Sequence, residues 1–291
     1  MELFPLILTF LSTGLHASWN LIARNQRSTD FFLRLSLLIT AIGLAPTVLA
    51  EFYSAPILSA VWRQLIIAGC FQSIYYLGLS RGYMTGDFAV VYPLSRAAPV
   101  LAIAILDVAR GEAPTFFGWL GLALTAIGCV LAPLTSLQDF TITRYWNKTS
   151  LWIALAAIGT IGYTAADSDA AKLIAPGPIA AIRYQVFEIS IATIAYTSIL
   201  VVLHTPTRVK GGWSNWRPVG IAAAGLFFSY ALILWAYQFS TPASYILAIR
   251  QLSVVLGVAA AAILIREPAA RFRLVAASLI TAGIICISLG G

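Results

Sequence analysis

Charged side chains are scarce in this sequence. Only 10% of its 291 residues are Asp, Glu, Lys or Arg, whereas a soluble globular domain carries about 25%. A surface with so few charges is not expected to face water, which argues against a separate soluble enzyme domain. The formal net charge of +7 is explained by basic residues in the loops between apolar segments, so a nucleic-acid partner is not expected.

Cysteine and histidine are also rare. The three cysteines, Cys70, Cys129 and Cys286, lie in apolar stretches and lack the paired spacing of a disulfide framework or a zinc site. They therefore suit a packing role. The two histidines, His16 and His204, are far apart, and the basic loops lack phosphate-binding glycine patterns. We expect no metal, no cofactor and no catalytic site.

Hydrophobic residues make up 60% of the chain, and the mean hydropathy is +0.87. A membrane-spanning helix needs about 20 apolar residues, so ten of them would use roughly 200. The first four residues lack the basic region of a signal peptide, so we expect the first apolar segment to be retained. Apolar runs between breakers predict ten transmembrane helices, at Leu3–Ala23, Phe31–Glu51, Trp62–Arg81, Phe88–Asp107, Thr115–Leu134, Ser150–Lys172, Pro178–Leu203, Pro218–Gln238, Pro242–Ile265 and Phe272–Leu289.

An internal repeat relates the two halves of the chain. An ungapped shift of 155 residues aligns Glu112 with Glu267 across a charged loop, and near the N-terminus a shorter shift pairs Arg34 with Arg183. The longer shift also matches Tyr75/Tyr230, Leu77/Leu232, Leu79/Leu234, Val100/Val255, Leu101/Leu256, Ala104/Ala259, Phe117/Phe272, Leu124/Leu279 and Gly128/Gly283.

Each half holds five predicted helices, and five is an odd number. The second half must therefore enter the membrane from the opposite side, as in the inverted repeats of secondary transporters. The sequence predicts an all-α integral membrane protein of ten transmembrane helices in two inverted five-helix repeats (5+5). Residues 1–135 form the first repeat, 136–149 the linking loop and 150–291 the second repeat.

Loop charge predicts the orientation in the membrane, because cytoplasmic loops are rich in Lys and Arg. On one side only Arg63, Arg110 and Lys172 are basic, so the rule places both termini outside the cytoplasm. The other side carries Arg24, Arg27, Arg81, Arg144, Lys148, Arg208, Lys210, Arg217, Arg266, Arg271 and Arg273.

With these motifs, the chain resembles the bacterial EamA-like branch of the drug/metabolite transporter (DMT) superfamily over nearly its whole length. The resemblance is carried by Arg34 and Arg183, by the segment Tyr92–Pro99, and by Glu112 and Glu267. It implies a bacterial inner-membrane exporter of amino acids, other metabolites or toxic compounds, driven by a proton or substrate gradient. It also implies a central cavity between the first four helices of each half, with the fifth and tenth helices at the flank. Such proteins are drawn with cytoplasmic termini, the opposite of what loop charge predicts here.

Arg96 and Arg250 lie inside predicted spans, where a charge costs about 3 kcal/mol or more. Arg96 is flanked by two prolines, and Arg250 is one position from the repeat equivalent of Arg96. Each arginine can bind a substrate carboxylate or phosphate. Alternatively, each can form an internal ion pair, Arg96 with Asp167 or Glu188.

Glu188 falls near the middle of its helix and is the first candidate for proton coupling, because a carboxyl group shielded from water can exchange protons. Asp167 is a second candidate and a cavity residue. Asp169 is two positions further, on a different face, and is expected to pair locally with Lys172.

His16, Trp19 and Asn20 share one face of the first helix, which suggests a cavity wall. His16 can carry protons or, more commonly, hydrogen-bond to a neighbouring helix. Aromatic rings with polar tips suit a ligand of mixed polarity. The predicted cavity residues are His16, Trp19, Asn20, Tyr75, Tyr76, Tyr92, Arg96, Tyr163, Asp167, Tyr245 and Arg250.

Arg34 and Arg183 either extend toward lipid headgroups or serve as structural pairing residues at equivalent places in the halves. Small residues such as Gly118 and Gly121 allow close helix approach, within one chain or between the chains of a homodimer. The leading functional hypothesis is a small-metabolite exporter working by alternating access, with protons and the lipid bilayer as further partners. The alternatives are a lipid-linked sugar or amine flippase, a multidrug exporter and, less favoured, an intramembrane enzyme.

Overall fold

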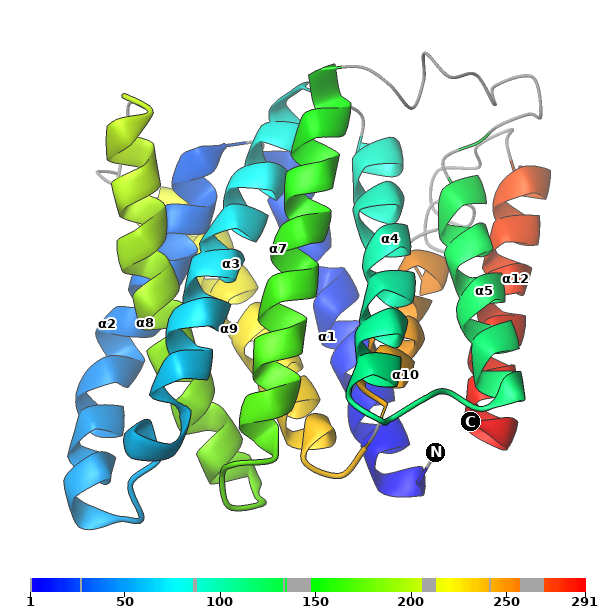
Figure 1. Cartoon of the computed structure of the whole chain (residues 1–291). Coiled ribbons are helices and arrows are strands. Elements are labelled where there is room, and N and C mark those ends of the chain that lie inside the picture. Colours follow the sequence, from blue (N-terminus) through cyan, green and yellow to red (C-terminus); the bar gives the residue numbers. More distant parts are fainter. Residues whose placement is uncertain are drawn as a thin grey trace.

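The protein is a bundle of helices (Figure 1). The computed structural model describes residues 2–26, 28–85, 88–132, 134, 148–205, 213–240, 242–256 and 270–291, and within these ranges no strand occurs. The helices are α1 (Leu3–Gln26), α2 (Thr29–Tyr53), α3 (Leu58–Thr85), α4 (Phe88–Ala109), α5 (Phe116–Leu131), α7 (Lys148–Ala171), α8 (Pro178–Val202), α9 (Trp213–Tyr237), α10 (Ala243–Ile249) and α12 (Ala270–Gly290).

Side-chain caps fix several helix starts. Ser28 accepts a hydrogen bond from the Phe31 N–H at 3.2 Å before α2, and Thr115 accepts one from the Gly118 N–H before α5. Such caps satisfy N–H groups that the first helical turn leaves without partners. At α10 the N–H of Ser244 donates to the buried carboxylate of Asp107, at 2.8 Å, which ties this helix to the end of α4.

Apolar side chains cover the outside of the bundle, and many polar ones are buried. Large exposed residues include Phe52, Phe116 and Leu289, whereas Asp167 and Glu188 are buried. Five helices in the described ranges are long and apolar enough to cross a membrane, and Phe116–Leu131, Ala243–Leu256 and Leu274–Gly290 are shorter apolar helical segments, the second of them with a turn at Arg250 and Gln251. This distribution of polarity is that of an all-helical membrane protein.

The helix α3 is long but more polar than the five helices that are apolar enough to cross a membrane. It is 28 residues long but is absent from the five helices that meet the apolar criterion. Its polar residues Gln72, Ser73, Tyr75 and Tyr76 are buried, because α3 packs along α7 and α8. These side chains therefore do not face lipid.

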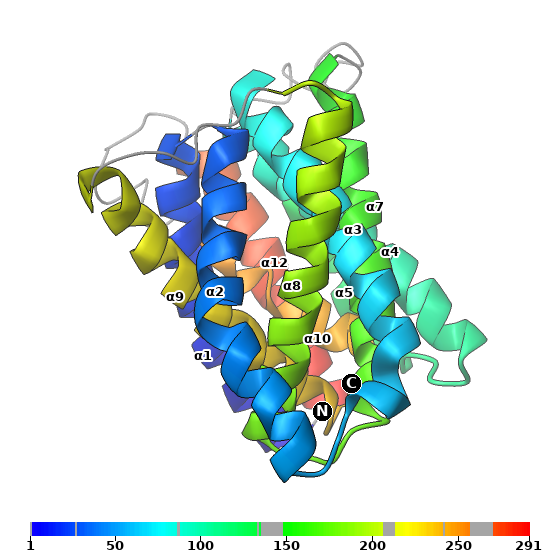
Figure 2. The same cartoon turned by 90° about the vertical axis from the view of Figure 1, so that its left-hand side faces the viewer.

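Helices far apart in the sequence lie side by side. The helix α3 packs along α7, α1 along α9, and α2 against α8. The helices α5 and α12 pack on each other at one flank (Figure 1), and α2, α8 and α3 form the opposite face (Figure 2). Both chain termini lie at the same end of the bundle (Figure 1).

Helix positions agree with the apolar runs to within a few residues, with two exceptions. The helix α9 begins at Trp213 and includes Pro218, which was expected to open it. The predicted span Pro242–Ile265 is interrupted, because α10 ends at Ile249 and the helix resumes at Leu252. The part of that span beyond Leu256 lies outside the described residues.

Candidate functional site

Buried polar and aromatic side chains from six helices and one helix break meet inside the bundle. They come from α1, α3, α4, α7, α8, α9 and the break after α10. The group comprises His16, Trp19, Gln72, Tyr75, Tyr76, Arg96, Tyr163, Asp167, Tyr184, Gln185, Glu188, Tyr230 and Arg250, all of them less than a tenth exposed. Ionisable residues inside a membrane protein mark its functional region by default, because burying them is costly.

Arg96 joins α4 to α1 and α3. Its Nη2 donates to His16 Nε2 at 2.9 Å and to the Tyr75 hydroxyl at 3.0 Å. The guanidinium carbon lies 5.6 Å from the centre of the Tyr75 ring, within the range of a cation–π contact. The side chain of Arg96 is thus held by two neighbouring helices.

His16 is contacted by two hydrogen-bond donors. Arg96 approaches its Nε2, and the indole N–H of Trp19 approaches its Nδ1 at 3.2 Å. A neutral imidazole has one acceptor nitrogen, so it can accept from only one of them at a time, and an imidazolium can accept from neither. This geometry favours the reading of His16 as a hydrogen-bonding residue toward a neighbouring helix over that of a proton carrier.

Asp167 connects three helices. Its Oδ1 accepts a hydrogen bond from Tyr184 of α8 at 2.9 Å, and its Oδ2 accepts a short one from Tyr230 of α9. Among the described residues, the hydrogen-bond partners of Asp167 are therefore two tyrosine hydroxyls rather than an arginine. The predicted cavity residues do not include Tyr184 or Tyr230, although the repeat matches Tyr230 to Tyr75.

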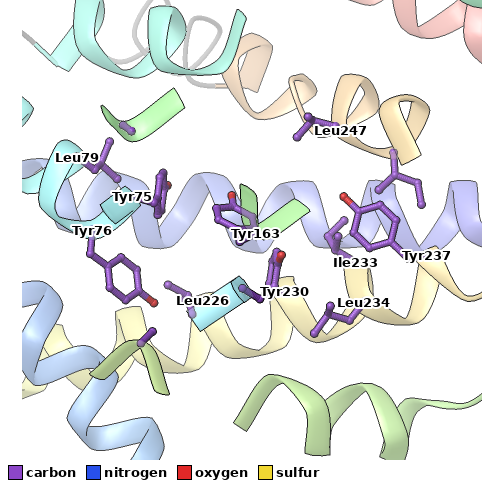
Figure 3. Packing of buried hydrophobic residues seen from close by; sticks show 14 of the residues in the cluster. Tyr75, Tyr76, Leu79, Tyr163, Leu226, Tyr230, Ile233, Leu234, Tyr237 and Leu247 are labelled. Carbon is purple, nitrogen blue, oxygen red and sulfur yellow. The ribbon is translucent and has the colours of Figure 1, made fainter. Parts of the chain in front are cut away.

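Three tyrosine rings form a row through the centre of the site (Figure 3). Tyr163 lies between Tyr75 and Tyr230, with ring centres 5.6 and 5.8 Å apart, which is normal contact for aromatic pairs. Arg96 stacks over Tyr75 at one end, and Arg250 stacks over Tyr230 at the other, 5.4 Å from the ring centre. The two guanidinium groups are close enough to interact electrostatically.

Glu188 occupies a different part of the site, between α8 and α3. It is 1% exposed, and neither of its carboxyl oxygens has a hydrogen-bond partner among the described residues. It interacts electrostatically with Asp167 and with Tyr76. Gln185, one turn away, is also buried, with both side-chain amide atoms unpartnered. This region holds polar groups that the described part of the fold does not satisfy.

Arg34 and Arg183 make contacts near the ends of the bundle. Arg183 forms a short ion pair with Glu51 and donates to the Ala55 carbonyl at 2.9 Å. Arg34 stacks over Trp216 at the start of α9, 5.8 Å from the ring centre.

The expected pair between Asp169 and Lys172 is wrong. Asp169 accepts from Arg110 Nη2 at 2.8 Å, and Lys172 forms a short ion pair with Glu112. The helix α7 ends at Ala171, so Lys172 lies outside it. A side chain three residues after Asp169 would lie beside Asp169 only if the helix continued. The segment after α4 supplies the partners instead.

Tyr245 lies apart from the arginines and the row of tyrosines, contrary to expectation. Its hydroxyl accepts from the Thr115 N–H at 2.9 Å, and it packs against Gly118 of α5. Because α10 begins at Ala243, Tyr245 falls in the first turn, more than one turn below Arg250.

Other predicted residues have less informative positions. Asn20 is buried and donates to the His16 carbonyl at 2.8 Å. The side chain of Tyr92 lies outside the described part of the structure. Gly118 and Gly121 serve contacts within the chain, since Gly121 lies against Gly283 of α12. Across the described ranges, no cluster of His, Cys, Asp and Glu could hold a metal ion.

Comparison with known proteins identifies the fold only. No protein-family profile matches the chain, and no curated protein matches it. A solved structure described only as "Crystal structure of protein" is similar to this chain with a TM-score of 0.70 and 15% sequence identity, covering 99% of this chain and 98% of the other. At that identity the likeness shows the fold alone. The same fold therefore occurs in a protein whose crystal structure has been solved.

Proposed function

We propose that this protein is a secondary active transporter that exports small metabolites by alternating access. Its substrates are amino acids or related anionic or zwitterionic compounds, and transport is coupled to protons. The proposal places the chain in the EamA-like branch of the DMT superfamily, in a bacterial inner membrane. Its ten helices form two inverted five-helix repeats.

The packing of the helices supports the repeat. Exchanging the halves turns α1 into α7 and α3 into α9. The α3–α7 pair then becomes the α9–α1 pair, and both pairs are packed along their lengths. The pairs α2–α8 and α5–α12 each map onto themselves, and both are in contact. A two-fold relation between the halves accounts for this pattern.

Individual residue contacts between α5 and α12 obey the same two-fold relation. A Cβ atom on Gly121 would lie 2.5 Å from the Gly283 carbonyl oxygen, and one on Gly128 would lie 2.8 Å from the Ala276 carbonyl oxygen. The shift of 155 residues maps Gly121 to Ala276 and Gly128 to Gly283. The two close approaches are therefore repeat equivalents.

The observation that carries the proposed function is the pair of buried arginines stacked on repeat-related tyrosines. Arg96 lies over Tyr75 and Arg250 over Tyr230, so both halves contribute the same chemistry to one central group. A substrate site at the interface of inverted repeats, near the middle of the membrane, is the arrangement that alternating access uses. Rocking of the halves would change the surroundings of this group.

The buried carboxyl groups of Asp167 and Glu188 have different surroundings, and we assign them different roles. Asp167 accepts hydrogen bonds on both oxygens from tyrosines, which offset part of the cost of burying its ionised form. Glu188 has no donor among the described residues, and an ionised carboxylate without hydrogen bonds is costly to bury. Glu188 is therefore the proposed proton-coupling residue, and Asp167 a fixed part of the site.

Counterflow in proteoliposomes tests the transporter proposal. The full chain is reconstituted, and the exchange of labelled amino acids and organic acids is measured with and without a pH gradient. We expect exchange of at least one compound that protein-free vesicles do not show. No exchange with any of these compounds, together with movement of a fluorescent lipid between leaflets, would favour a flippase.

The coupling residue is tested by Glu188→Gln. This variant keeps the shape of the side chain but cannot release a proton. We expect exchange without a gradient to persist and the acceleration by a pH gradient to disappear. Thr197→Ala, on the same helix, is a matched control that leaves the acceleration intact. Gradient-driven transport in Glu188→Gln would remove Glu188 from this role.

A further inference from the structure

The helix that carries Arg250 is broken at that residue. The helical segments Ala243–Ile249 and Leu252–Leu256 are separated by a turn at Arg250 and Gln251. Neither residue is Pro or Gly, the usual causes of a break. The Gln251 side chain donates to the Leu247 carbonyl at 2.8 Å, which satisfies an acceptor of the interrupted helix. The side chain of Gln251, at the break, thus stabilises the interrupted helix.

Three acceptors associated with Arg250 or its helix accept hydrogen bonds from other groups. The hydroxyl of Ser253 donates to the carbonyl of Arg250 itself at 2.9 Å, and Gln251 occupies the Leu247 carbonyl. Asp167, the carboxylate that interacts electrostatically with Arg250, accepts from a tyrosine on each oxygen. None of these groups bonds the guanidinium.

Arg250 is therefore a buried cation with unsatisfied donors. It is 2% exposed, and its Nε and Nη1 have no hydrogen-bond partner among the described residues. The guanidinium carbon lies over the Tyr230 ring, 5.4 Å from its centre, a cation–π contact that leaves the hydrogen-bonding capacity of the N–H groups unused. A buried charge without an acceptor is strongly unfavourable, and an anion would relieve that cost.

The second buried arginine is in a different situation. Arg96 donates to His16 and to Tyr75, so its hydrogen bonds hold helices together. Arg250 makes no such link between helices through its guanidinium among the described residues. Arg250 lies one position from the repeat equivalent of Arg96, and it differs from Arg96 in having an Nη group without a hydrogen-bond partner among the described residues.

We propose that Arg250 binds the anionic group of the transported molecule, a carboxylate or a phosphate, and that Arg96 is a positioning residue. The identity of this ligand as a transported molecule rests on the proposed function. A guanidinium matches the two oxygens of a carboxylate or phosphate. Tyr163, Tyr230 and Tyr237 lie within electrostatic reach of Arg250, and their rings (Figure 3) would offer aromatic surface to the organic remainder of such a molecule.

Anion binding is measured by thermal unfolding of the full chain in detergent, without any transport step. The probes are succinate, benzoate and inorganic phosphate, each compared with chloride at equal ionic strength and with choline as a cation. We expect at least one of the three anions to raise the melting temperature by about 5 °C near 100 times its dissociation constant. We expect Arg250→Gln to weaken that anion by about 10- to 100-fold, and Arg250→Lys to weaken it less.

Arg63→Gln is the matched control, because it removes an exposed arginine of α3 that stacks on Trp62. It should leave anion stabilisation unchanged. In anion-free buffer Arg250→Gln should melt no lower than the wild type, since it removes an unsatisfied charge, whereas Arg96→Gln should melt lower. This comparison separates a binding role from a structural one.

The outcomes distinguish this inference from the proposed function. Stabilisation that persists in Arg250→Gln, or a fall in its anion-free melting temperature as large as that of Arg96→Gln, overturns the inference. If no anion stabilises the wild type while counterflow exchanges neutral or cationic compounds, the inference fails and the transporter stands. If Arg250→Gln abolishes anion stabilisation but counterflow finds no exchange, the binding site stands and the transporter proposal fails.

Discussion

Glu51 and Arg183 form an ion pair that fixes the start of α8 against the turn between α2 and α3. The same carboxylate accepts from the N–H groups of Ile57 and Leu58, at 3.0 and 3.1 Å. Both side chains are less than a tenth exposed. One carboxylate thus serves an arginine and the first N–H groups of α3 together.

Glu51→Gln should therefore destabilise the protein strongly. Removing one partner of a buried ion pair costs about 3 kcal/mol or more, because the other charge stays buried without compensation. The measurement is unfolding by SDS in mixed micelles. Glu112→Gln breaks the more exposed pair with Lys172 and should cost at most about 1 kcal/mol. Equal effects of the two substitutions would show that Glu51 is not part of a buried pair.

The tyrosines on Asp167 should be energetically linked to it. Tyr230→Phe removes a hydrogen bond to a carboxylate and should lower the free energy of unfolding by about 1.5–3 kcal/mol. In Asp167→Asn the same tyrosine substitution should cost less, because the charged acceptor is gone. The double-mutant cycle measures this difference. Tyr53→Phe, at an exposed tyrosine, is the control with no expected effect, and strictly additive substitutions would contradict the contact.

The positions of the helices could be predicted from the sequence, but their interactions could not. The run Ser150–Lys172 agrees with α7 to within two residues at its start and one at its end, because apolar runs and breakers act locally. The partner of Asp169 is Arg110 of a different helix end, and no local pattern specifies it. The break at Arg250 depends on the Gln251 side chain bonding the Leu247 carbonyl, which leaves no signature of Pro or Gly.

Among the sequence features, the internal repeat predicts the most about which residues form the site. It matches Tyr75 with Tyr230 from the sequence alone, and in the structure a buried arginine lies over each of these rings. It could not indicate that Tyr230 also bonds Asp167, since that contact depends on how α7 and α9 pack. Residue types that the two halves share can be predicted from the sequence, whereas contacts between different helices can be identified only from the structure.

Close packing of α5 on α12 should be sensitive to the smallest side chains. Gly121→Val would place its Cβ 2.5 Å from the Gly283 carbonyl oxygen, and backbone cannot yield as a flexible side chain does. We expect a loss of about 1–3 kcal/mol in the free energy of unfolding, as for overpacking in cores. Gly14→Ala, where nothing lies within 4 Å, should be neutral or stabilising. A neutral Gly121→Val would indicate that α5 and α12 separate freely.

The orientation of the bundle can be tested directly, because both termini lie at one end (Figure 1). At that end Arg110 and Lys172 are engaged by Asp169 and Glu112, while the sequence-based topology assigns most loop arginines and lysines to the opposite side. Lys and Arg in short loops stay cytoplasmic, so a C-terminal tag should face the outside. Labelling of a C-terminal cysteine tag by a membrane-impermeant maleimide in intact cells measures this, with Cys70, Cys129 and Cys286 replaced by Ala. The same tag labelled only after permeabilisation would instead agree with the cytoplasmic termini that the DMT resemblance implies, and would show that loop charge misleads in a chain built from opposed halves.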